Sequence, residues 1–165
     1  MSPQQRTGLT RRERDLAARA ATFEARSFHG VVHGTVPVRS AHGLVDDDGR
    51  PVALEAELDL AGLSTGNPRR DKDLRSPRFF DTGSHPVMRF RADDVVPSGE
   101  GWQVRGTLSI GAAACPLVMH VARGGEFYDG FTGTVAVTTR ELGVRAPRIL
   151  IRERVTLRIS ARLLG

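Results

Sequence analysis

Cysteine is nearly absent from this chain, and long apolar runs are missing altogether. Cys115 is the single cysteine among 165 residues, so no disulfide can form within the chain. A secretory signal needs an apolar run of roughly 7–15 residues and a membrane-spanning helix needs about 20, and neither pattern occurs. The sequence therefore predicts a cytoplasmic protein without a transmembrane segment.

Lysine is as scarce as cysteine, because Lys72 is the only one and arginine supplies the positive charge. The formal net charge of +5 favours anionic partners such as nucleic acid or lipid headgroups. The arginines form no long run, however, and most aromatic residues fall at inward positions, where bases cannot stack on them. We therefore expect no nucleic-acid partner and keep a nucleic-acid-binding protein only as the weakest alternative.

The common catalytic motifs are missing as well. No glycine-rich phosphate loop, HExxH or GxSxG is present. Cys115 precedes Pro116 in an alanine-rich loop with no base nearby in the sequence, which is a poor setting for a nucleophile. The histidines, His29, His33, His42, His85 and His120, lack cysteine or carboxylate partners at metal-binding spacing. We expect no enzyme, no catalytic residue and no metal.

What the chain has instead is alternation of apolar and polar residues, the pattern of half-buried strands. In segment 52–60 the even-numbered residues are apolar, whereas Glu55, Glu57 and Asp59 are acidic. Similar strands are predicted at 88–92, 102–110, 131–138 and 155–163, and weaker ones at about 22–28, 31–39, 41–46 and 117–123. We expect the apolar sets of 52–60 and 102–110 to face inward, with Glu55, Glu57, Arg105 and Thr107 outside.

Short turns separate these strands. Segments 46–51, 97–101 and 124–126 are rich in Gly, Pro, Asp and Glu. Strands joined by short loops pair antiparallel, because a parallel crossover needs a dozen or more residues. Eight or nine strands with one apolar face each indicate an all-β sandwich or a closed barrel.

Two segments break the alternation. Residues 1–20 are basic, and Thr10 with Glu13 fits a helical capping box, so we predict a helical appendage there and a barrel or sandwich domain over 21–165. Residues 64–85 are dense in charge. Pro68 suits a helix start and Pro77 a helix stop, which predicts a short helix at about 69–76.

The second segment also carries a recognisable motif. The run TGNPRRDKDLRSPRFFD closely resembles the hallmark of the YceI-like family. The matching residues are Thr65, Gly66, Asn67, Arg70, Asp71, Leu74, Arg75, Ser76, Phe79, Phe80 and Asp81. Weaker likeness, including Gly130 with Phe131, extends the resemblance over roughly 22–163.

This resemblance implies an antiparallel up-and-down, lipocalin-like β-barrel of about eight strands. Some members of the family hold a polyisoprenoid in the lumen. We therefore expect a non-catalytic carrier of a long apolar ligand, a polyisoprenoid, an isoprenoid quinone or a similar lipid, and no other cofactor. The expected ligand-binding residues are Leu54, Leu58, Phe79, Phe80, Met88, Phe90, Trp102, Val104, Leu108, Phe131, Val135 and Leu157. The alternative is that such residues fill the barrel, leaving a structural or protein-interaction module, and a homodimer stays open.

The 64–85 loop is expected to close over one side of the barrel. Arg70, Asp71 and Arg75 are candidates for an ion-pair latch, with the other motif residues in structural roles. We place this loop beside the entrance to the lumen, where Arg69 or Arg78 would accept a headgroup. Phe79 and Phe80 are expected to plug into the barrel.

Overall fold

A computed structural model describes residues 12–27, 30–48, 50–124, 130–143 and 154–163. Its strands are β1 (Arg12–Ala17), β2 (Ala20–Ser27), β3 (Gly30–Val45), β4 (Pro51–Asp59), β5 (Val87–Ser98), β6 (Gly101–Ile110), β7 (Ala113–Arg123), β8 (Phe131–Thr138) and β9 (Arg154–Leu163). A 3-10 turn, η1 (Leu60–Gly62), and one helix, α1 (Pro68–Arg75), lie between β4 and β5. The described chain is thus mostly antiparallel strand.

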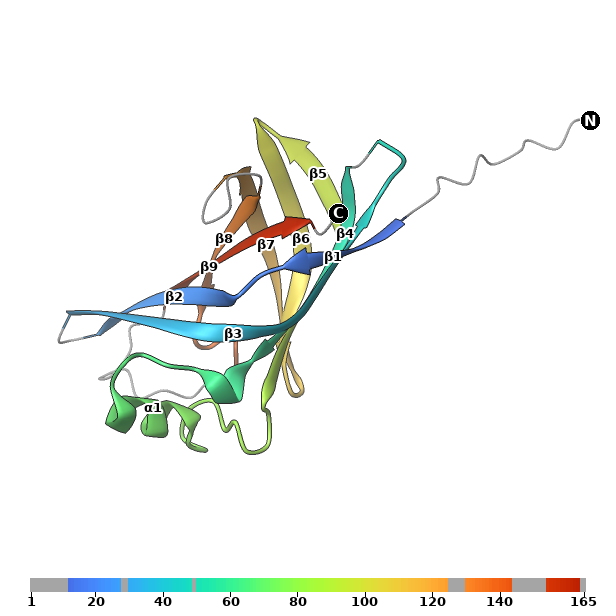
Figure 1. Ribbon diagram of the computed structural model, residues 1–165. Coiled ribbons are helices and arrows are strands. Elements are labelled where there is room, and N and C mark those ends of the chain that lie inside the picture. Colours follow the sequence, from blue (N-terminus) through green and yellow to red (C-terminus); the bar gives the residue numbers. More distant parts are fainter. Residues whose placement is uncertain (1–11, 28–29, 49, 125–129, 144–153, 164–165) are drawn as a thin grey trace, which may run out of the picture.

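The sheet closes on itself (Figure 1). The strand order is β1-β3-β2-β9-β8-β7-β6-β5-β4, and the pairing of β4 with β3 completes the circle. Strands β1 and β2 share one position, because both pair with β3 on one side and β9 on the other. The prediction of a closed antiparallel barrel of about eight strands is therefore confirmed.

The side-chain alternation follows the predicted register. Leu58 pairs with Met88 across β4 and β5, and both side chains are buried. On the outer face, Glu55 pairs with Arg91 at 2.7 Å and Glu57 with Arg89 at 3.1 Å. A slip of one residue would reverse these two faces, so inward burial of the apolar set fixes the register.

Strand β1 corrects the prediction of a helical appendage. Residues 12–17 are extended, and Arg12–Asp15 pair with His42–Val45 of β3. Leu16 lines the barrel interior, so the segment supplies apolar surface to the barrel. Thr10, the expected helix cap, lies outside the described residues. The few apolar residues of this segment fit a helical and a strand period equally well. Pairing with β3 and β9 makes the segment a strand.

Strand β3 is also longer than predicted. The two strands expected at 31–39 and 41–46 form a single strand of 16 residues. Its pairing with β4 shifts register between Val38 and Ser40, which is a β-bulge or irregularity. Such a feature bends a strand without ending it, so β3 can curve around the barrel.

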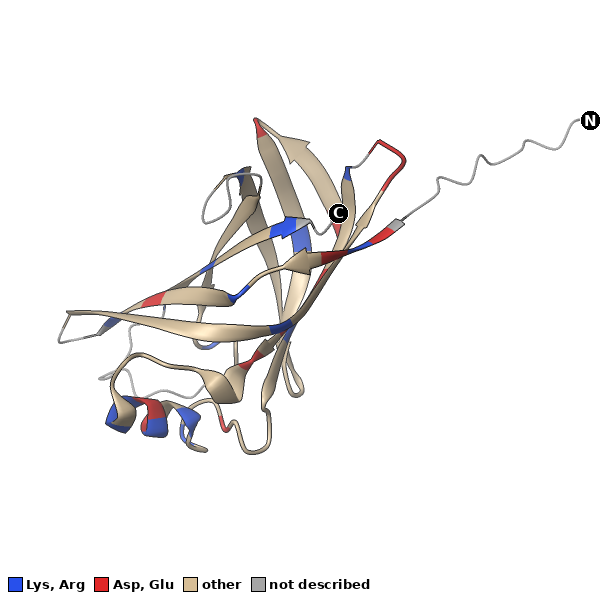
Figure 2. Ribbon diagram, viewed as in Figure 1, with Lys and Arg blue, Asp and Glu red and all other residues tan. Residues whose placement is uncertain are grey.

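The connection from β4 to β5 covers one end of the barrel (Figure 1). Helix α1 begins at Pro68 and ends at Arg75, close to the predicted 69–76. Figure 2 shows acidic and basic residues side by side along α1. Beneath the helix, Leu60, Leu63, Leu74 and Phe79 are all less than 9% exposed. This end of the barrel is a packed base.

We expect Asn67→Ala to lower the free energy of unfolding by about 1 kcal/mol, since this residue caps α1. The Asn67 side chain accepts a hydrogen bond of 3.1 Å from the backbone N–H of Arg70. Urea denaturation would measure the change. Asn67→Asp, which keeps an acceptor, should stay within a few tenths of a kcal/mol of the parent. Equal loss in both variants would contradict the capping role.

Within the described ranges, no helix is both long enough and apolar enough to cross a membrane.

Candidate functional site

A cavity of about 450 Å³ occupies the barrel interior. Its wall is built from the inward rows of most strands, because side chains alternate between the two faces of a sheet. Apolar residues dominate, among them Leu54, Leu58, Met88, Phe90, Trp102, Val104, Leu108, Leu117, Met119, Val121, Phe131, Val135, Leu157 and Ile159. The lumen therefore contains open space with a mainly apolar wall, whereas the end of the barrel beneath α1 is packed with side chains.

All but two of the residues expected to contact a ligand lie on this wall. The wall includes Leu54, Leu58, Met88, Phe90, Trp102, Val104, Leu108, Phe131, Val135 and Leu157. The exceptions are Phe79 and Phe80, which pack in the base with Leu60, Leu63 and Leu74. Backbone bonds from Phe79 to Ser76 and from Phe80 to Leu74 hold the pair beneath α1, so we no longer assign it to the ligand.

The cavity is blind at the α1 end. Its wall includes Leu58 and Met88 but no described residue between them, so η1, α1 and their loops stay outside it. Packing of the base fills the space that an entrance there would need. The expected entrance beside the 64–85 loop is therefore wrong. Arg69 and Arg78 are exposed on that loop and do not line the cavity.

The cavity reaches the opposite end of the barrel, because its wall includes residues at the start of β4 and the end of β7. Figure 1 shows that β3 meets β4 and β5 meets β6 at this end. Asp48, Arg50 and Pro51 from the β3–β4 turn line it there. The Arg123 guanidinium lies 5.4 Å from the centre of the Trp102 ring, a cation–π distance. We call this end the mouth. Sequence analysis missed Arg50 and Arg123, and their place at strand ends beside turns was the available signal.

Two further contacts order the mouth. The rings of Trp102 and Phe131 meet edge to face, with centroids 5.3 Å apart and planes at 74°. The Asp46 carboxylate accepts 2.9 Å hydrogen bonds from the backbone N–H groups of Asp48 and Arg50. These side-chain-to-backbone bonds hold the backbone of Asp48 and Arg50 in place, and thereby the point from which the Arg50 side chain extends.

The motif residues of the 64–85 loop hold the base together by hydrogen bonds. The Asp71 carboxylate, 6% exposed, accepts bonds from the Thr65 backbone N–H at 2.9 Å and from the Thr65 hydroxyl at 2.5 Å. Arg70 donates to the Thr65 hydroxyl at 2.9 Å. Arg75 donates to the carbonyl oxygens of Ala61 and Leu63. No ion pair among the three charged side chains occurs in the described structure, so the expected ion-pair latch is corrected.

Cys115 lies in the base and not on the cavity wall. Burial raises the pKa of its thiol, and the negative charge of Glu141 raises it further. Hydrogen bonds from the Thr138 N–H and hydroxyl lower the pKa of the Glu141 carboxyl, which keeps that carboxylate charged. A protonated, buried thiol is a poor nucleophile.

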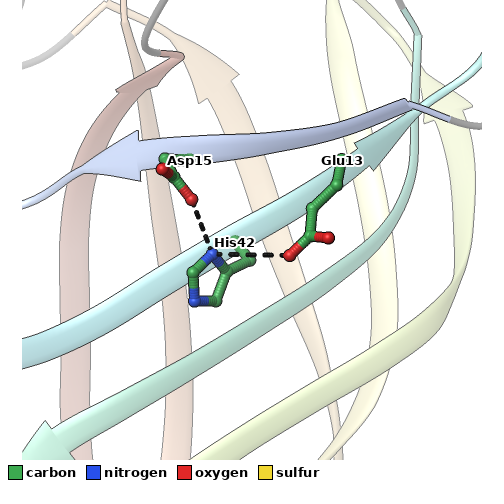
Figure 3. Close-up of polar contacts among 3 residues, drawn as sticks. All are labelled: Glu13, Asp15 and His42. Carbon is green, nitrogen blue, oxygen red and sulfur yellow. Dashed lines mark hydrogen bonds and ion pairs between the residues drawn. The ribbon is translucent and has the colours of Figure 1, made fainter.

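A polar cluster on the barrel exterior ties β1 to β3 (Figure 3). His42 Nδ1 lies 2.8 Å from an Asp15 carboxylate oxygen and 3.8 Å from one of Glu13. His42 and Glu13 border an outer hollow that shares Gly43, Leu54 and Glu55 with the cavity wall. In the part of the chain described, no three His, Cys, Asp or Glu side chains form a group that could hold a metal ion.

Known proteins resemble this chain in both sequence and fold. UPF0312 protein plu2095 of Photorhabdus laumondii is 32% identical over 80 residues, which cover 48% of this chain and 42% of that protein. A UPF0312 protein of Shewanella denitrificans is 27% identical over 101 residues, covering 56% of this chain and 52% of that one. The chain thus matches about half the length of these relatives.

Solved structures share the fold at lower identity. Burkholderia cenocepacia BcnA superposes with a TM-score of 0.69 at 15% identity, covering 88% of this chain and 96% of that one. A polyisoprenoid binding domain from Saccharophagus degradans gives a TM-score of 0.64 at 14% identity, covering 93% and 97%. The family model of the YceI-like domain matches residues 13–163. This chain therefore belongs to the YceI-like domain family.

Proposed function

We propose that this protein is a carrier that holds a long apolar molecule in its lumen, a polyisoprenoid, an isoprenoid quinone or a similar lipid. The observation that carries the proposal is the blind, apolar cavity of about 450 Å³. Its volume is within the range of ligand pockets, roughly 300–1,000 Å³. The Saccharophagus degradans structure, described as a polyisoprenoid binding domain, has the same fold and supports the choice of ligand class.

The cavity also accounts for affinity. Each methylene that a ligand buries contributes about 0.8 kcal/mol, while ordering a flexible chain opposes binding. A ligand without polar groups along its length loses no hydrogen bonds in such a site. An isoprenoid or acyl tail satisfies both conditions.

We further propose that the protein performs no chemistry on its ligand. The most reactive side-chain type in the chain, the thiol of Cys115, is buried in the base, and burial raises its pKa. The groups at the mouth, Arg50, Arg123 and Trp102, suit binding better than proton transfer, because arginine stays protonated at ordinary pH. Storage or transport is the activity that this arrangement supports.

The filled-barrel interaction module is the second candidate. Solid packing of Leu60, Leu63 and Leu74 favours it at the base, but the open half of the lumen favours a carrier. A cytoplasmic location and a homodimer remain predictions. Cell fractionation would test the first, and sedimentation the second.

The test is titration of the delipidated protein with an isoprenoid quinone and, separately, a long-chain isoprenoid phosphate. Trp102 is the only tryptophan and lies on the cavity wall, so we expect its fluorescence to change on binding. The melting temperature should rise, because a ligand at 100 times its Kd stabilises the fold by about 2.7 kcal/mol. A protein that responds to neither ligand would favour the filled-barrel module.

A further inference from the structure

The mouth of the cavity differs in chemistry from its wall. Strand β7 points Leu117, Met119 and Val121 into the lumen, and the next residue in this inward row is Arg123. The row therefore changes from apolar to cationic at the point where the cavity meets solvent. Arg50 adds a second guanidinium from the β3–β4 turn.

The mouth carries charges of both signs, because Asp46, Asp47 and Asp48 share the β3–β4 turn with Arg50, whereas Arg123 lies at the end of β7 (Figure 2). Glu55, which also borders the cavity, is held by Arg91 on the outer face at 2.7 Å. Asp48 is the remaining carboxylate on the cavity border. In the described ranges neither Arg50 nor Arg123 forms an ion pair, and the Arg123 guanidinium lies over the face of Trp102. The guanidinium groups keep donors for an incoming anion.

The blind base limits how much of a tail can enter. A cavity of about 150 Å³ holds one benzene molecule, so six carbons. By that measure a cavity of about 450 Å³ holds on the order of 18 carbons. Beyond Leu58 and Met88 the side chains of Leu60 and Leu63 are 0% and 1% exposed, so the tail cannot extend further inward.

We propose that the ligand is a single-chain amphiphile with an anionic headgroup, a carboxylate or a phosphate, that binds tail first. Its tail fills the lumen up to a limit on the order of 18 carbons. Its headgroup lies at the mouth against Arg50 and Arg123. This inference rests on the proposed carrier function and narrows its ligand class: it selects an anionic headgroup over a neutral quinone and a short tail over a long polyisoprenoid, and it adds the orientation.

The experiment is calorimetric titration of the delipidated protein. One series uses fatty acids of roughly 10 to 24 carbons, and the Kd should fall about fourfold per methylene until the cavity is full, then level off. A second series compares palmitate, hexadecyl phosphate and hexadecanol. We expect at least one of the two anions to bind at least tenfold more tightly than the alcohol, and their order identifies the headgroup. Calorimetry avoids Trp102 fluorescence, which substitution of Arg123 would itself alter.

Variants assign the headgroup site. Arg123→Gln and Arg50→Gln should each weaken binding of the preferred anion by about tenfold and leave hexadecanol binding unchanged. Arg69 is an exposed arginine on α1 at the closed end, so Arg69→Gln is the matched control and should bind the anion like the parent. Thermal unfolding of each variant would show that the barrel is intact.

The outcomes separate the two proposals. Equal binding of anions and alcohol, or affinity that keeps rising through the longest acids, would overturn this inference and leave the carrier function standing. Loss of anion binding in Arg69→Gln with none in Arg123→Gln would also overturn it. Failure of every chain to bind the folded protein would overturn both proposals.

Discussion

Replacing Ala56 with phenylalanine is expected to weaken binding of an apolar ligand by at least about 100-fold and leave the barrel folded. Ala56 lines the cavity on β4 opposite Ala41 of β3, so the added ring would extend into open space. A phenyl ring takes the room of about six ligand carbons. Losing even four buried methylenes costs about 3 kcal/mol, which is more than 100-fold in Kd. Titration with the ligand that binds the parent best would measure the effect.

The matched control is Ala136→Phe. Ala136 is exposed on the outer face of β8, between Val135 on the cavity wall and the buried Val137. The same side-chain change on this face should leave the Kd within about twofold, because surface changes away from a site cost little. Unchanged binding in Ala56→Phe would show that the ligand does not bind in the lumen. Unfolding of Ala56→Phe would show that the lumen has no room for the added ring beside Ala56.

Asp71→Ala is expected to lower the free energy of unfolding by about 1–3 kcal/mol. The Asp71 carboxylate is buried and accepts hydrogen bonds from both the N–H and the hydroxyl of Thr65. Truncation leaves these donors without an acceptor at the base of the barrel, and it removes a negative charge from the first turn of α1. Urea denaturation would measure the loss.

Asp73→Ala provides the control, because Asp73 is an exposed acid on the same helix. This change should stay within about 0.5 kcal/mol of the parent. Asp71→Asn keeps one acceptor oxygen and should fall between the parent and Asp71→Ala. If Asp71→Ala proved as stable as Asp73→Ala, the hydrogen bonds to Thr65 would contribute nothing measurable.

Local patterns in the sequence predicted the elements that local forces determine. Alternation over 52–60 and 102–110 identified β4, β6 and their inward faces. Pro68 and Pro77 bracketed α1 to within a residue at each end. In these segments propensity, turn chemistry and burial all favour one conformation, which is the condition for reading structure from sequence.

Features that depend on distant packing were not readable. Whether 12–17 is helix or strand was decided by pairing with β3 and β9, which nothing in the segment itself encodes. The position of the mouth depended on which end the β4–β5 connection fills. Phenylalanine at 79 and 80 fits a ligand site and a packed base equally well, because both are apolar environments. Arg50 and Arg123 gained significance only once the mouth was located.

The blind base has a kinetic consequence for a carrier. A tube open at both ends allows an incoming molecule to displace the bound one from behind, whereas the residues that the structure describes leave this cavity open at one end. A bound tail must therefore leave before its successor can enter. For the proposed carrier, exchange between ligands would be limited by the dissociation rate and would not speed up when the competitor is more concentrated.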